Sequence, residues 1–83
     1  MTLDPQEVRR KLRQYITREL IRDADYPLGD DEEIITLGLI DSYALAELSV
    51  FVEDEFDVYI PDPDLTVNSM NTLNQMVARV LKN

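Results

Sequence analysis

Apolar residues recur at helical spacing in three stretches of the chain, and this periodicity constrains the fold more than any other feature. Residues three or four positions apart share one face of a helix, so each set forms a stripe that another element must bury. Prolines and glycines fall between the stretches and end the helices. The three stripes are Val8, Leu12, Tyr15, Ile16 and Leu20; Leu45, Leu48, Val52 and Phe56; and Leu73, Met76, Val77, Val80 and Leu81.

The first helix has a well-marked start. Asp4 is a suitable N-cap, Pro5 suits the first helical position, and Glu7 stands where an acid closes a capping box. We expect this helix to end near Arg22, because turn-forming residues follow.

Residues 23–41 break the helical pattern. Pro27, Gly29, Gly38 and a run of four acids exclude a continuous helix there. A connection of this length in a compact domain is usually either functional or a sign that the elements are wrongly assigned. We expect it to pack onto the helices through its apolar members, which are Leu28, Ile34, Ile35, Leu37, Leu39 and Ile40.

The second helix is predicted to begin at Ser42 and to end at Glu55 or Phe56. Ser49 interrupts its apolar stripe, and we expect the Ser49 hydroxyl to bond back to the carbonyl of Leu45.

The last third of the chain contains one short and one longer helix. Residues 58–60 form an extended link, a short turn of helix is predicted from Pro63 to Val67, and Ser69 is expected to cap the last helix. Met70 and Met76 are interpreted as core residues. The sequence therefore predicts an all-α fold: a small four-helix bundle of three main helices, one short helix and a long loop between the first and second.

Composition limits the chemistry available to this chain. Its 83 residues make one small domain, and they include neither cysteine nor histidine. Disulfides, thiolate catalysis, zinc–thiolate sites and the usual neutral-pH base are thereby excluded. An enzyme would depend on carboxylates, hydroxyls and tyrosines, so a binding or carrier module is favoured over an enzyme. No membrane-spanning run or signal peptide is recognisable, and we expect a cytoplasmic protein.

The charge is strongly negative and unevenly distributed. The formal net charge is −9, and between Asp23 and Ala78 there are fourteen acids and no base. Nucleic acids and anionic membranes are therefore improbable partners, whereas a basic protein surface fits the central segment. Six of the eight bases lie in the first helix, where an exposed cationic face is a simpler explanation than an anion site.

The Asp41-Ser42 pair lies where the long loop meets the second helix. A serine there has its hydroxyl beside unpaired backbone N–H groups and the positive end of the helix dipole. These groups also stabilise a phosphate ester, and Asp41 can cap the helix if Ser42 is esterified. Taken alone, the pair is more simply an ordinary helix cap.

The interpretation of the Asp41-Ser42 pair changes when three segments are considered together. In chain order they are Gly38-Leu39-Ile40-Asp41-Ser42, Glu53-Asp54-Glu55-Phe56 and Ile60-Pro61-Asp62. Together they make the chain resemble the acyl carrier protein family, which includes the peptidyl carrier domains, over nearly its whole length. The resemblance implies one carrier domain over residues 1–83. It implies that Ser42, with Asp41 beside it, receives 4′-phosphopantetheine from coenzyme A through a Mg²⁺-dependent phosphopantetheinyl transferase. Such a carrier holds acyl or aminoacyl intermediates as thioesters in fatty acid, polyketide or nonribosomal peptide biosynthesis, and it has no catalytic residues or resident metal of its own.

Tyr43 departs from the family pattern, which usually has Leu or Met after the serine and sometimes Phe. Tyr43 therefore places a larger side chain with a polar tip beside Ser42, the residue that a transferase must recognise. Two interpretations stay open: Tyr43 alters which transferase or partner enzyme is accepted, or it offers an aromatic contact in place of leucine.

A partner surface is predicted on the second helix. Tyr43, Glu47, Val50 and Asp54 recur at i, i+4, i+7 and i+11 and share one face. Acids around a small apolar contact suit basic docking surfaces of acyl- or aminoacyl-loading and synthase enzymes. We expect a monomer that binds such enzymes weakly. The alternative is an unmodified acidic helical adaptor that binds a basic protein.

Overall fold

The first helix, α1 (Pro5–Tyr15), begins as the sequence predicts. In the computed structural model, which describes residues 3–82, Asp4 is the N-cap and its carboxylate accepts from the Gln6 N–H at 3.0 Å. The predicted capping box is not completed, because Glu7 pairs with Arg10 instead.

The expected continuation to Arg22 is helical but changes type. Residues Ile16–Leu20 form a π-helical turn, closed by the Ile21 N–H donating to the Ile16 carbonyl at 2.8 Å. The Thr17 hydroxyl donates to the Arg13 carbonyl at 2.9 Å, and such back-bonding competes with the regular helical ladder. Arg22 then takes a left-handed φ of 64°, which ends the helix.

The second helix, α2 (Ser42–Phe56), matches its predicted bounds. It ends at Asp57, which adopts a left-handed conformation and donates its N–H to the Glu53 carbonyl at 3.0 Å. The bond expected from Ser49 goes elsewhere: its hydroxyl donates to the carbonyl of Ala46, three residues back, at 2.7 Å.

The segment after α2 differs from the prediction. In place of one short helix over 63–67, there are a 3₁₀ turn, Asp62–Asp64, and a separate one-turn helix, α3 (Val67–Met70). Leu65 leaves the helical region with a ψ of 67°, so the two turns cannot merge.

The last helix, α4 (Leu73–Lys82), is not capped by Ser69, which lies within α3. Thr72 takes that position. Its hydroxyl accepts from the Gln75 N–H at 3.1 Å, while the Gln75 side chain accepts from the Thr72 N–H at 2.9 Å. This is the reciprocal pattern of a capping box.

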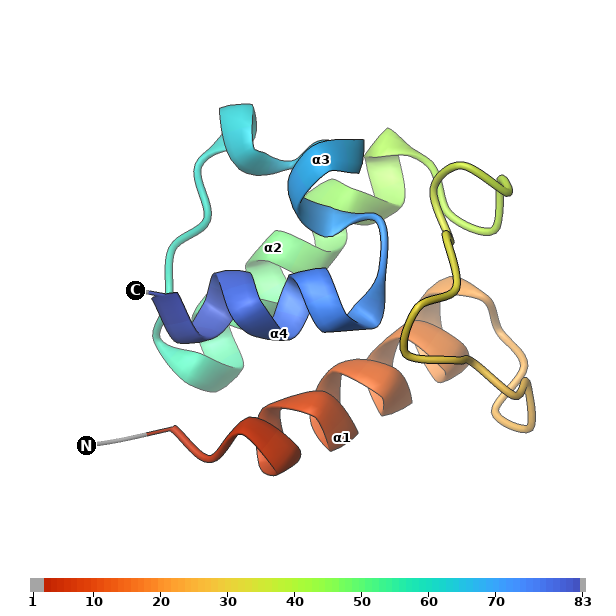
Figure 1. Cartoon of the computed structure of the whole chain (residues 1–83), viewed down its shortest axis with the longest axis horizontal. Helices are drawn as coiled ribbons and strands as arrows, with labels where there is room; N and C mark the ends of the chain where they lie inside the picture. The colour runs from red at the N-terminus through yellow and green to blue at the C-terminus, as the bar shows by residue number, and fades with distance from the viewer. Residues whose placement is uncertain (1–2, 83) are drawn as a thin grey trace.

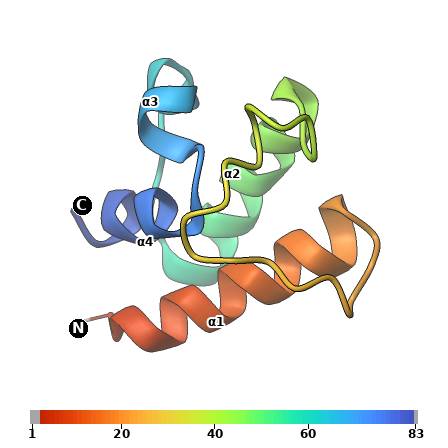
Figure 2. The same ribbon diagram turned by 45° about the vertical axis from the view of Figure 1, so that its right-hand side comes forward.

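All four α-helices contribute to one core, and the described residues form no strand. α1 and α4 lie side by side, and α2 and α3 complete the globule (Figures 1 and 2). Residues from every predicted stripe are buried, and so are the two predicted core methionines, Met70 and Met76. The described residues are helical without strands, so the all-α prediction is confirmed. Of residues 3–82, no helix has the length and apolar character required to cross a membrane.

The long loop packs back onto the helices as predicted, with one exception. Leu28, Ile34 and Ile40 are buried in the core. Leu37 was expected among them but is 65% exposed. It lies in the surface turn that the Gly38 N–H closes by donating to the Ile35 carbonyl.

Candidate functional site

Ser42 is the first helical residue of α2, and it is exposed. Asp41, with extended backbone angles, is the N-cap, and its carboxylate accepts from the Ala44 N–H at 2.9 Å. The Ser42 hydroxyl is therefore not required for capping. The first N–H groups of a helix lack intrahelical acceptors, so donors lie beside this hydroxyl.

The turn before Ser42 is built from short-range backbone bonds. Gly38 has a φ of +80°, a conformation that strongly favours glycine, and its N–H donates to the Ile35 carbonyl at 3.0 Å. The Leu39 N–H donates to the Ile34 carbonyl at 2.9 Å. Ile40 is buried, so it anchors the chain immediately before the exposed Asp41.

Asn71 holds this turn to the rest of the molecule, although no periodicity or motif in the sequence marks it as important. Its buried amide oxygen accepts from the N–H groups of Ile35 and Thr36, at 3.0 and 3.1 Å. Its amide nitrogen donates to the Thr36 hydroxyl, and its backbone carbonyl accepts from the Ile34 N–H, both at 2.9 Å. One side chain between α3 and α4 thus fixes the segment leading to Ser42.

A second cluster fixes the middle of the loop. Asp30 pairs with Arg13 and, at 3.3 Å, with Arg9. Its backbone carbonyl accepts from the Asn74 N–H at 3.0 Å. The loop is therefore attached to α1 and α4 at Asp30 and to Asn71 at residues 34–36, so Ser42 follows an anchored segment.

The four residues of the predicted docking face lie on the surface of α2. The Tyr43 side chain is 75% exposed and Val50 is 58% exposed, and Glu47 and Asp54 are exposed as well. Three further large apolar side chains are exposed: Leu37 on the loop, Tyr59 after α2 and Val67 on α3.

Two tyrosines have altered acidity. Partial burial, together with the negative charges of Glu47 and Glu19, raises the pKa of Tyr15. The Tyr26 hydroxyl donates to the Glu32 carboxylate, and this bond is the main cause of the raised pKa of Tyr26. Both phenols are therefore neutral near neutral pH, and neither supplies a base there.

Within residues 3–82, no three acidic side chains converge in an arrangement that could hold a metal ion. The candidate site therefore consists of one exposed hydroxyl, a capped helix start and an acidic face with apolar contacts. No model of a known protein family matches this chain.

Proposed function

We propose that this chain is a carrier protein that bears 4′-phosphopantetheine on Ser42. The observation that carries the proposal is the exposed Ser42 hydroxyl at the first position of α2, with capping left to Asp41. An ordinary capping serine would use its own oxygen for that bond.

The surroundings of Ser42 suit an attached phosphodiester. The adjacent backbone N–H groups and the positive end of α2 favour a negatively charged group. In the proposed transfer, the Ser42 oxygen forms a new P–O bond, the phosphoanhydride of coenzyme A breaks, and the adenosine bisphosphate leaves. The serine proton passes to a base of the transferase, because neither cysteine nor histidine occurs in this chain.

The bound arm would supply a thiol that carries an acyl or aminoacyl group as a thioester. The chain itself then needs only to anchor the arm and to present a surface. The acidic α2 face with exposed Tyr43 and Val50 supports docking by enzymes with basic surfaces. Fatty acid, polyketide and nonribosomal peptide synthesis would all use the site in this way.

Intact-mass spectrometry tests the proposal. The apo protein is incubated with coenzyme A, Mg²⁺ and a broad-range phosphopantetheinyl transferase. Wild type should gain the mass of one phosphopantetheine, and Ser42→Ala should gain none. Ser49→Ala is the matched control, because Ser49 lies on the same helix and should not affect loading. No gain by wild type, or equal gain by Ser42→Ala, would contradict the assignment.

Tyr43→Leu separates the two interpretations of the departure from the family pattern. If Tyr43 restricts the transferase, this variant will be loaded faster than wild type; if Tyr43 only replaces a leucine contact, the rates will be equal. An unmodified adaptor, the alternative function, would be loaded in neither form.

A further inference from the structure

The positive charge of this acidic protein is concentrated on its first helical segment. Residues 5–20 carry five basic and two acidic side chains, whereas the rest of the chain carries three basic and fifteen acidic ones. Most of the five bases have an acidic partner: Arg9 and Arg13 pair with Asp30, Arg10 with Glu7, and Lys11 with Glu55.

Arg18 differs from the other four. It is exposed, and it forms no ion pair within residues 3–82. Arg10, Gln14 and Arg18 are spaced four residues apart and form one row along the helix. This row, here called the α1 ridge, separates the two hollows described next.

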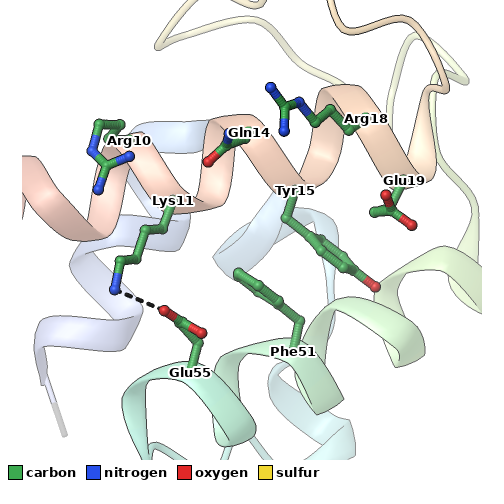
Figure 3. A pocket seen from close by; sticks show the side chains of 8 residues that line it. All are labelled: Arg10, Lys11, Gln14, Tyr15, Arg18, Glu19, Phe51 and Glu55. Atoms are coloured by element: carbon green, nitrogen blue, oxygen red, sulfur yellow. Dashed lines mark hydrogen bonds and ion pairs between the residues drawn. The ribbon is translucent and has the colours of Figure 1, made fainter.

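The first hollow is a groove of about 430 Å³ between α1 and α2 (Figure 3). The rings of Tyr15, from α1, and Phe51, from α2, stack against each other and line the groove, with centroids 4.1 Å apart and planes at 15°. Both rings are half-buried, so part of their apolar surface lines the groove. The Lys11–Glu55 pair, at 2.7 Å, stands at one end.

The second hollow lies on the other side of the α1 ridge and has a volume of about 360 Å³. The three ridge residues line it as well, together with Arg13 and Tyr26. The Nε atom of Arg13 is buried and has no hydrogen-bond partner in the described part of the chain. The ridge arginines can therefore be approached from two sides.

We propose that the α1 ridge and the Tyr15–Phe51 groove form a second interaction surface, which binds an acidic amphipathic helix of another protein. Arg10 and Arg18 are eight residues apart, about 12 Å along the axis. Two acids seven or eight residues apart on a partner helix match that spacing. An aromatic or leucine side chain midway between them would lie over the stacked rings.

A second copy of this chain would also offer two acids seven residues apart, Glu47 and Asp54, but it brings a further charge of −9, so we assign the occupant to another protein. A small anion would contact one ridge arginine at a time, whereas a helix spans both. This surface carries charge of the opposite sign to the Tyr43–Asp54 face of α2, so the chain would recognise two classes of partner.

A peptide titration tests the inference. The ¹⁵N-labelled protein is titrated with a capped 16-residue helical peptide of Ala and Gln, which carries two Glu eight residues apart and one Trp midway. Saturable NMR shift changes are expected at Gln14, Tyr15, Arg18 and Phe51. A control peptide of equal composition, with its Glu residues four apart, should bind several-fold more weakly.

Matched variants locate the interaction. Arg18→Glu should weaken binding at least about fivefold, the change expected for reversing a charge on a docking surface. Lys82→Glu makes the same charge change on α4, outside the groove, and should alter binding by less than twofold. Circular dichroism verifies that both variants fold.

Three outcomes would overturn the inference: no saturable shifts, equal binding of the two peptides, or equal loss in the two variants. Concentration-dependent sedimentation of the free protein that Arg18→Glu abolishes would also overturn it, because the occupant would then be a second copy. Ser42→Ala should bind the peptide as wild type does. A failure of Ser42 loading is thus distinguishable from a failure of this surface.

Discussion

Asn71 shows how one buried polar side chain can determine where a functional group is presented. Its amide oxygen accepts hydrogen bonds from two backbone N–H groups of the loop that leads to Ser42. Within the described residues, these two N–H groups have no other acceptor. Sequence periodicity could not reveal this, because Asn71 lies between two helices, where an asparagine ordinarily indicates a turn. Only the folded arrangement brings Ile35 and Thr36 to it.

Asn71→Ala should therefore lower the free energy of unfolding by about 1–2 kcal/mol, since it leaves two part-buried N–H donors without their acceptor. Asn68→Ala makes the same change at an exposed position of α3 and should cost less than about 0.5 kcal/mol. Urea denaturation followed by circular dichroism measures both. Equal losses would show that Asn71 does not anchor the loop.

Tyr26 gives a prediction for alkaline pH. Its neutral hydroxyl donates to Glu32, and its pKa is raised from the ordinary value of 10.0. The bond stabilises the fold fully below pH 10.0, and this contribution is lost as the pH rises through the raised value. Glu32→Gln should lower the pKa of Tyr26 toward 10.0 in an NMR titration, whereas Glu33→Gln should leave it unchanged. An unaltered pKa in Glu32→Gln would contradict this interpretation.

The helices that begin with a clear N-cap and carry a long apolar stripe were predictable from the sequence, whereas the short helical turns were not. The Asp4 and Asp41 caps and the apolar stripes determine where α1 and α2 begin. The two turns between Asp62 and Met70 have too few residues for a periodicity to be recognised. The prediction that Ser69 caps α4 is wrong, although the pattern Thr72-x-x-Gln75, a capping-box signature, is present in the sequence.

This correction can be measured. Thr72→Ala should destabilise the protein by about 1 kcal/mol, because it removes the cap of α4. Ser69→Ala should cost at most about half as much, because Ser69 lies inside α3. Thermal denaturation of the two variants distinguishes them. A larger loss of stability for Ser69→Ala than for Thr72→Ala would show that Ser69, and not Thr72, caps α4.

At the scale of the whole molecule, charge separates the surface into an acidic α2 face and a basic α1 ridge. The sequence predicted the acidic face, because its residues recur at helical spacing. It could not predict the groove beside the ridge. The groove is lined by the stacked rings of Tyr15 and Phe51, which lie on different helices and come into contact only in the folded structure.

Glu47→Lys tests the acidic face. We expect it to lower kcat/KM for phosphopantetheinyl transfer about fivefold, with little change in folding stability, and the effect should shrink as salt is added. Asp25→Lys makes the same charge change on the exposed loop and should have a smaller effect. An unchanged rate for Glu47→Lys with every partner enzyme tested would remove Glu47 from the docking surface.

Tandem mass spectrometry of the loaded protein locates the modification and so tests the role of Ser42. The protein is loaded by a transferase, digested and fragmented. We expect one phosphopantetheine, carried by the peptide that contains Ser42 and assigned to the Ser42 hydroxyl oxygen. A modification assigned to Ser49 or Ser69, or an unmodified Ser42 peptide after exhaustive loading, would contradict this role.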